Sequence, residues 1–184
     1  MRIFVDTADP AEIEEWNEHS WVSGFTTNPT LVRAAGSDPS VLAKLTDKCI
    51  SIDGGPEVWD YGPHVWRKVT GPTDGKGQVN WTGICHERQI PPFLMSQTDI
   101  VSVFAGRIMD TGRDPRPLIE RVKTWRAQVL WASVREPYNI TQAEQAGCDI
   151  VTVPPAILRK YLEWNGLPLE VVAERTIAQF EADR

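Results

Sequence analysis

Residues 100–133 read IVSVFAGRIMDTGRDPRPLIERVKTWRAQVLWAS, and this stretch contains the pattern that decides the fold. Its first six residues, 100–105, are almost wholly apolar, as in a strand that is buried on both faces. Residues 115–127 have a helical pattern, and residues 128–133 return to a strand-like run. A strand, a helix and a second strand in this order predict two parallel strands joined by a crossover helix.

The same alternation continues on both sides of this stretch. Further strands are predicted at residues 2–6, 22–27, 49–53, 65–70, 79–84 and 149–153, and further helices at 10–19, 39–48, 137–146, 155–164 and 168–182. Eight strands in a β-then-α order predict an α/β fold, a closed (β/α)₈ TIM barrel that forms one domain over residues 1–184. The alternative is an open doubly wound sheet. No GxGxxG motif follows the first strand, which disfavours the dinucleotide-binding form of that alternative.

The chain is short for such a barrel. It has 184 residues, whereas about 250 is usual and about 200 is already small. A crossover with its helix needs roughly 10–12 residues, so the room between residues 53 and 65 is borderline and the room between 70 and 79 is too small. We therefore expect a thinned helix layer around strands 3–5. Apolar wall left bare there, including Trp59 and Trp81, would be covered by a second copy of the chain or by the C-terminal helix, which predicts a homo-oligomer as one possibility.

Composition excludes several classes of function. The chain has 19 Lys and Arg against 25 Asp and Glu, a formal net charge of -6, which disfavours nucleic acid and anionic membranes as partners. No apolar run is long enough for a membrane span, and the N-terminal residues lack a signal-peptide pattern, so we expect a cytoplasmic protein. The spacing of Cys49, Cys85 and Cys148 fits neither a disulfide framework nor a zinc site.

Polar side chains recur where the predicted strands end, which is where (β/α)₈ barrels place their reactive groups. They comprise one lysine, two carboxylates, three hydroxyls, one amide and two arginines: Lys68, Asp6, Asp53, Thr26, Thr82, Ser133, Asn28, Arg107 and Arg135. A desolvated lysine amine can attack a carbonyl and form an imine, and a carboxylate can then move a proton at a substrate hydroxyl. Arginines can bind a phosphate through two parallel hydrogen bonds. The set therefore predicts carbonyl chemistry on a phosphorylated substrate.

Each residue also has an ordinary structural interpretation. A lone lysine in a strand usually faces solvent, and Asp6 and Asp53 could cap helices or turns. Asn28 before Pro29 is typical of a turn. Side chains alternate between the two faces of a strand, so if Lys68 faces the barrel interior, its neighbour Arg67 faces outward. An outward arginine would cost free energy beneath a packed helix, but not where that helix is missing. From the residues alone, the prediction reaches an enzyme-like α/β barrel.

Six motifs give the chain a resemblance to a known family. They are VDTAD (5–9), GFTTNPT (24–30), VWRKVT (65–70), VSVFAGRIMDTGRDP (101–115), LWASVRE (130–136) and AGCDIVTVPPAIL (146–158). In this order they resemble the motifs of the transaldolase and fructose-6-phosphate aldolase family, and they span nearly the whole chain. The resemblance implies a (β/α)₈ barrel with class I aldol chemistry and with neither a metal nor an organic cofactor.

The resemblance also implies a role for each strand-end residue. Lys68 would form the Schiff base, and Asp6 would assist proton transfer at the sugar hydroxyl. Thr26 and Asn28 would hold substrate hydroxyls, and Thr82 would position the catalytic water. The sugar phosphate would be bound by Arg107, Ser133 and Arg135.

Two positions distinguish the branches of the family. Asp53 stands where transaldolases have a glutamate, and Phe104 stands where the aldolases have a tyrosine. A carboxylate together with a phenylalanine favours transaldolase-like transfer of a dihydroxyacetone unit between sugar phosphates. Two alternatives stay open: an aldolase that releases free dihydroxyacetone, and a degenerate barrel that binds sugar phosphates without catalysis, which the shortened middle and the missing proline after Lys68 suggest.

Overall fold

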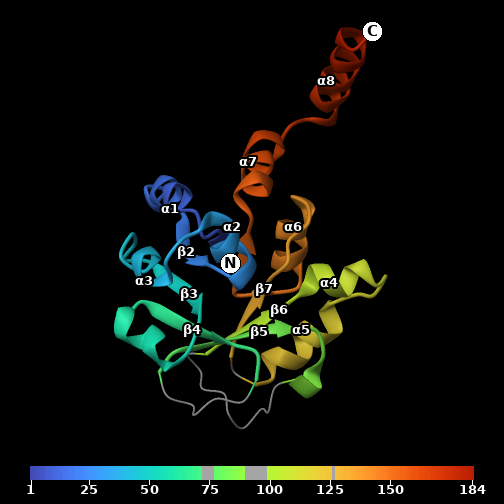
Figure 1. Ribbon diagram of the computed structural model, residues 1–184. Helices are drawn as coiled ribbons and strands as arrows, with labels where there is room; N and C mark the ends of the chain where they lie inside the picture. Colours follow the sequence, from blue (N-terminus) through green and yellow to red (C-terminus); the bar gives the residue numbers. More distant parts are fainter. Residues whose placement is uncertain (72–76, 90–98, 126) are drawn as a thin grey trace.

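A computed structural model describes residues 1–71, 77–89, 99–125 and 127–184. Its parallel strands form one closed barrel in chain order (Figure 1). They are β1 (Arg2–Asp6), β2 (Val22–Thr26), β3 (Cys49–Asp53), β4 (Val65–Val69), β5 (Val79–Ile84), β6 (Ile100–Val103), β7 (Gln128–Trp131) and β8 (Ile150–Val153). Because β1 pairs with both β2 and β8, the ring closes, which confirms the (β/α)₈ barrel and excludes the open sheet.

The helices surround the strands. Those of the described residues are α1 (Pro10–Asn17), α2 (Pro29–Ala35), α3 (Pro39–Leu42), α4 (Ala105–Asp110), α5 (Arg116–Lys123), α6 (Tyr138–Gln145), α7 (Pro155–Trp164) and α8 (Leu169–Ala182), together with the 3₁₀ turns η1 (Pro56–Tyr61) and η2 (Glu87–Gln89). The first three helices begin in the same way: Asp9, Asn28 and Asp38 each accept a hydrogen bond from a backbone N–H of the first turn, and a proline follows the cap.

The structure differs from the prediction in several elements. Helices α2 and α4 were not predicted, and α4 begins so early that β6 ends at Val103 instead of residue 105. The helix predicted over residues 39–48 shortens to four residues. The hydroxyl of Thr46 accepts from the N–H of Lys48 and donates to Asn17, and such local side-chain bonds compete with a helix.

In the ranges that the structure describes, the helix layer is thin around β3, β4 and β5, as predicted. Only the short η1 follows β3, and the described residues between β4 and β5 contain no helix, residues 72–76 lying outside the description. Arg67 is half-buried, and its Nε donates to the carbonyl of Gly54 at 3.1 Å. The side chains along β4 alternate as expected. Val65 belongs to the apolar cluster outside the ring of strands, and Trp66 belongs to the cluster inside it.

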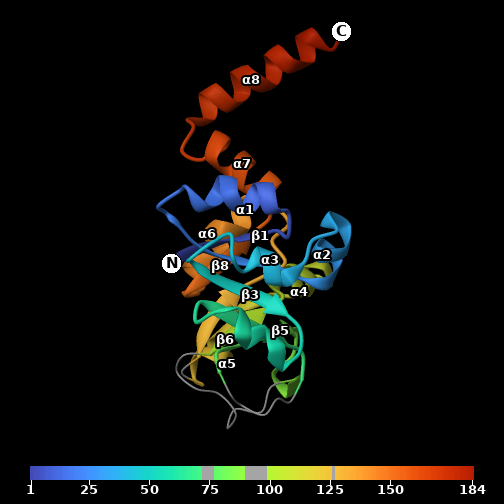
Figure 2. The same ribbon diagram turned by 60° about the vertical axis from the view of Figure 1, so that its left-hand side comes forward.

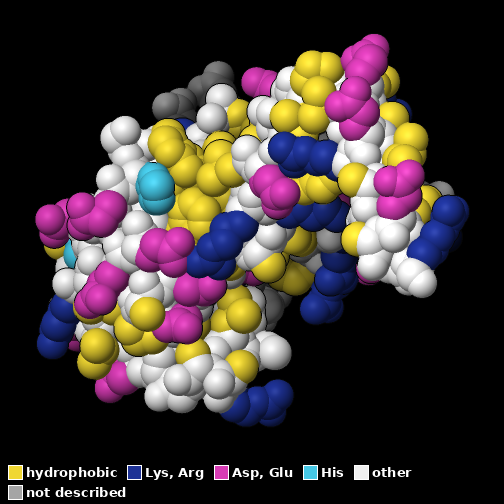
Figure 3. All heavy atoms as spheres, turned by 90° about the horizontal axis from the view of Figure 1, so that it is seen from above, with side chains coloured by type: hydrophobic (Ala, Val, Ile, Leu, Met, Phe, Trp, Pro, Cys, Tyr) yellow, Lys and Arg dark blue, Asp and Glu magenta, His cyan; other side chains and the backbone are white. Residues whose placement is uncertain are grey.

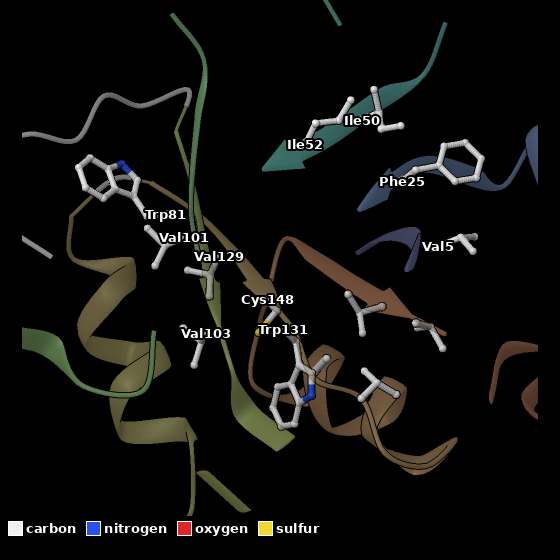
Figure 4. Close-up of a cluster of buried hydrophobic side chains, with 14 of the residues drawn as sticks. Val5, Phe25, Ile50, Ile52, Trp81, Val101, Val103, Val129, Trp131 and Cys148 are labelled. Atoms are coloured by element: carbon white, nitrogen blue, oxygen red, sulfur yellow. The ribbon is translucent and has the colours of Figure 1, made fainter. Parts of the chain in front are cut away.

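Two apolar clusters fill the barrel wall and its lower end. The larger cluster lies between the strands and the helices and includes Phe25, Ile50, Trp81 and Trp131 (Figure 4). Because Trp81 is fully buried, the prediction that it leaves bare wall is wrong; the side chain of Trp59 lies outside the described residues. The smaller cluster, built on Phe4, Trp66, Ile100, Leu130 and Ile150, plugs the interior. Polar space is therefore left at the carboxyl ends of the strands.

The C-terminal helix α8 does not cover the thinned wall. It continues beyond α7 and extends away from the barrel, on the side opposite β4 and β5 (Figures 1 and 2). Its fourteen residues include none that is buried, and Leu169, Ile177 and Phe180 are among the most exposed large apolar side chains of the described residues. Figure 3 views the molecule from this end and shows apolar side chains interspersed with charged ones. None of the described helices is both long and apolar enough for a membrane span.

Candidate active site

One cavity of about 560 Å³ opens at the carboxyl ends of the strands, and all nine predicted site residues line it. Each strand end supplies its residue because the strands are parallel and their register aligns the ends: Asp6 pairs with Thr26, and Asp53 with Lys68. The structure therefore brings together residues from position 6 to position 135 of the chain.

Lys68 lies on β4 with its side chain inside the barrel. It is only 7% exposed, and its Nζ donates to the backbone carbonyl of Thr27 at 2.6 Å. Burial lowers the pKa of Lys68, and the negative charges of Asp6 and Asp53 oppose this shift. Burial thus favours the neutral amine, which is the nucleophilic form.

Asp6 is the last residue of β1 and lines the same cavity. Its Oδ1 accepts a hydrogen bond of 2.7 Å from the hydroxyl of Thr26. Burial raises the pKa of Asp6, while Lys68 and the Thr26 hydrogen bond lower it in part. A carboxyl group whose pKa moves upward toward neutrality is suited to accept and return a proton.

Thr82 presents an unpartnered hydroxyl to the cavity. It lies on β5 and is 6% exposed, and its Oγ1 has no hydrogen-bond partner among the described residues. Buried hydroxyls nearly always have a partner in proteins. The hydroxyl is therefore available to a water molecule or to a substrate, on the side of the cavity to which Asp53 and Lys68 also belong.

The amide of Asn28 serves the fold and the cavity at once. Its Oδ1 caps α2 by accepting from the N–H of Leu31 at 3.0 Å. The turn expected at Asn28 and Pro29 is therefore the start of a helix instead, and the Nδ2 group of Asn28 is the donor that remains for a ligand.

Three residues form the rim on the opposite side. The guanidinium of Arg107 lies over the ring of Phe104, 5.2 Å from its centroid, and Arg135 forms an exposed ion pair of 3.0 Å with Asp110. Ser133 has a φ of 64°, a left-handed conformation that residues other than glycine rarely adopt. Gly106 packs so closely against it that an added Cβ would lie 1.7 Å from the Ser133 carbonyl oxygen.

Sequence reasoning missed four polar residues inside the barrel. Ser102 donates to Asn80 at 2.6 Å, and Asn80 donates to Ser51 at 3.0 Å. Of these three, Ser102 lines the cavity. Thr152 on β8 contacts Thr26 and also lines the cavity. The sequence itself could have indicated Thr152 and Ser102, because each is the single polar residue in a strand whose other residues are isoleucine and valine.

No cluster of three or more His, Cys, Asp or Glu side chains able to hold a metal occurs in the part of the chain that the structure describes. The predicted absence of a metal and of an organic cofactor stays a prediction. The three cysteines are free thiols, and burial raises the pKa of both Cys49 and Cys148 to about 12.

Comparison with known proteins gives consistent relatives. A probable transaldolase of Nitrosopumilus maritimus (strain SCM1) is 30% identical over 195 residues, covering 89% of this chain and 88% of that protein. A probable transaldolase of Paracoccus denitrificans (strain Pd 1222) is 28% identical over 216 residues, covering 100% and 96%. A crystal structure of orotidine 5'-monophosphate decarboxylase from Metallosphaera sedula aligns over 98% of both chains with a TM-score of 0.46 and 12% identity, a level from which nothing about function follows.

A comparison with family models also gives a match. The model described as Transaldolase/Fructose-6-phosphate aldolase matches residues 74–183, which is more than half of the chain. The matched region contains the rim arginines and β8, and the relatives extend the similarity over the lysine strand. Together with the closed barrel, these matches establish that the chain belongs to the transaldolase/fructose-6-phosphate aldolase family.

Proposed function

We propose that the chain transfers a dihydroxyacetone unit from a ketose phosphate to an aldose phosphate through a Schiff base on Lys68. One observation supports this above all: a lysine, 7% exposed, stands inside a closed barrel and lines the same cavity as Asp6 and Asp53. Aldol chemistry of this kind needs a neutral amine, and burial lowers the pKa of this one.

The first half of the reaction cleaves the donor. The Nζ lone pair of Lys68 attacks the C2 carbonyl of the ketose phosphate, and the carbonyl oxygen leaves as water to give an imine. Asp6 takes the proton from the C4 hydroxyl, the C3–C4 bond breaks, and its electron pair moves into the iminium to give an enamine. The other fragment leaves as an aldose phosphate.

The second half reverses these steps on the acceptor. The enamine carbon attacks the aldehyde carbon of a second aldose phosphate, and Asp6 returns its proton to the new hydroxyl. Water then hydrolyses the imine and frees Lys68. We assign the handling of that water to Asp53 and Thr82, whose carboxylate and unpartnered hydroxyl line the cavity. We assign the phosphate to Arg107, Ser133 and Arg135. We assign substrate hydroxyls to Thr26 and Asn28, which line the same cavity.

Borohydride reduction tests the proposal. The protein is incubated with fructose 6-phosphate, reduced, digested and mapped by mass spectrometry. We expect a reduced adduct on Lys68 and none in the Lys68→Ala variant. An adduct on another lysine, or no adduct in the wild-type protein, contradicts the proposal.

Assays with and without an acceptor separate the related activities. Transfer requires an acceptor aldose phosphate, whereas release of free dihydroxyacetone without acceptor identifies an aldolase. Phe104 favours transfer, because the cavity has no tyrosine at this place. Binding of sugar phosphates without turnover, unchanged in Lys68→Ala, identifies a non-catalytic barrel.

We also propose that the partner of α8 is a second copy of the chain. The helix extends away from its own barrel, and its side chains Ile177 and Phe180 are 58% and 60% exposed. Apolar side chains on an extended helix are usually covered by another surface.

A further inference from the structure

Thr152 is a buried hydroxyl for which the proposed reaction has no direct use. It lies on β8, is 4% exposed, and faces the barrel interior, whereas its neighbours Val151 and Val153 face the outer core. A buried hydroxyl costs free energy unless it forms a hydrogen bond. The hydroxyl of Thr152 forms a hydrogen bond of 2.6 Å with the hydroxyl of Thr26.

The two threonines connect Thr152 to Asp6. Strands β8 and β2 flank β1 on either side, and the hydroxyls of Thr152 and Thr26 meet inside the barrel. The same Thr26 oxygen donates to Oδ1 of Asp6 at 2.7 Å. Three strands thus contribute to one row of three polar groups that ends on a carboxyl group.

Proton counting fixes the direction of these hydrogen bonds. An ionised carboxylate can only accept hydrogen bonds, so the single hydroxyl hydrogen of Thr26 is donated to Asp6. The hydrogen bond between the two threonines must then be donated by Thr152. When Asp6 is protonated, it can donate to Thr26, and Thr26 can donate to Thr152. The row therefore keeps both hydrogen bonds in both protonation states of Asp6.

A group that must take up and return a proton gains from this property. Without Thr152, the oxygen of Thr26 would lose the donor that polarises it, and its bond to Oδ1 of Asp6 would weaken. The ionised carboxylate loses more from this than the neutral group, which can carry its proton on Oδ2 and accepts the Thr26 bond less strongly. Donation along a row of hydroxyls strengthens the last bond by about 10–30%. The effect stabilises the ionised form of Asp6.

We propose that Thr152 is a positioning residue that acts through Thr26 to hold Asp6 in both of its protonation states and to favour its ionised form. Its role in the reaction rests on the proposed function, whereas its effect on Asp6 does not. The other titratable groups of the cavity are Lys68 and Asp53, and the guanidinium groups of Arg107 and Arg135 lie at the rim. None of these four side chains is bonded to Thr152.

The first test measures Asp6 directly and needs no turnover. The protein is labelled with ¹³C at the aspartate side-chain carboxyl, and the Asp6 signal is assigned by its loss in Asp6→Asn. In Thr152→Val, which keeps the shape but removes the hydroxyl, we expect the titration of Asp6 to move to higher pH by about half a pH unit. Thr152→Ser should titrate like the wild-type protein.

A matched control removes another buried threonine hydroxyl. Thr7 is 3% exposed and donates to Glu12, not to Asp6, although it adjoins Asp6 in the sequence. Thr7→Val should leave the Asp6 titration unchanged. If Thr152→Val does not fold, Thr152→Cys keeps the size with a much weaker donor and should shift the titration in the same direction.

The second test measures the reaction. In Thr152→Val the low-pH limb of the kcat profile for donor cleavage should move to higher pH together with the Asp6 titration, while Thr152→Ser restores it. An unchanged Asp6 titration in a folded Thr152→Val overturns the inference. Absence of a borohydride adduct in the wild-type protein contradicts only the proposed function, because the titration is measured without substrate.

Discussion

Asp53 and Lys68 occupy paired positions on neighbouring strands, so a carboxylate and a buried amine approach one another across the β3–β4 ladder. The negative charge of Asp53 raises the pKa of Lys68 and partly offsets the effect of burial. In the proposed reaction, imine formation and hydrolysis both move protons near this amine, and a neighbouring carboxylate could take part in that transfer.

Asp53→Asn should lower kcat for transfer by about 10²-fold or more with a small change in KM, because the amide cannot take a proton from water. Steady-state kinetics with fructose 6-phosphate and an acceptor measure this. Asp60 lies exposed on η1, in the loop that follows Asp53, and Asp60→Asn should leave kcat unchanged. A kcat equal to that of the wild-type protein in Asp53→Asn would remove Asp53 from the reaction.

Lys68 should make the stability of the protein depend on pH. Its pKa in the folded protein lies below the ordinary 10.5, so between these two values the unfolded chain binds one more proton than the folded chain. The free energy of unfolding should therefore rise with pH across this window, by up to about 1.4 kcal/mol per pH unit, and Lys68→Met should abolish that slope. Urea denaturation of both proteins at several pH values measures the difference; equal slopes would show that the lysine is not desolvated.

Arg135 should recognise the phosphate and not the sugar. Arg135→Ala should raise KM about tenfold for a phosphorylated donor and leave KM unchanged for an unphosphorylated ketose, because a charge-assisted hydrogen bond is lost only with the former. Arg113 is also exposed but lines a different surface cavity, so Arg113→Ala is the matched control. An equal effect of Arg135→Ala on both substrates would indicate a structural role.

Gly106 should be intolerant of any side chain. In Gly106→Ala the new Cβ would lie 1.7 Å from the carbonyl oxygen of Ser133, so the backbone of the rim must move. We expect a loss of about 2 kcal/mol or more in the free energy of unfolding and a raised KM for the phosphorylated donor. At Gly71 an added Cβ meets nothing within 4 Å, and Gly71→Ala should change neither quantity. Thermal melting compares the two variants.

The C-terminal helix should determine the assembly state. The wild-type protein should sediment as an oligomer, and the double variant Ile177→Asp with Phe180→Asp should sediment as a monomer, because charges on an apolar interface oppose its burial. Gln179→Asp adds a charge to the same helix at an exposed polar position and should leave the oligomer intact. A wild-type monomer in analytical ultracentrifugation would refute the assignment.

The barrel and most of its site were predictable because parallel strands impose simple rules. Each predicted strand exists, and the strand-end rule placed Asp6, Lys68 and Arg135 around one cavity although they are far apart in the chain. Strand alternation correctly separated the inward Lys68 from the outward Arg67.

Other features depend on contacts that no local pattern contains. The short α2 begins because Asn28 caps it, yet the same Asn-Pro pair is typical of a turn. The hydroxyl of Thr152 becomes informative only when β8 closes against β1 and brings it to Thr26. The left-handed Ser133 packs closely against Gly106 of α4, which lies 27 residues earlier in the chain.

Closure of the barrel has a consequence for biosynthesis. The row Thr152–Thr26–Asp6 crosses the seam at which the last strand to be made meets the first. Until β8 has been made and paired with β1, Thr26 lacks its Thr152 partner, so the hydrogen-bonded row that ends on Asp6 is incomplete.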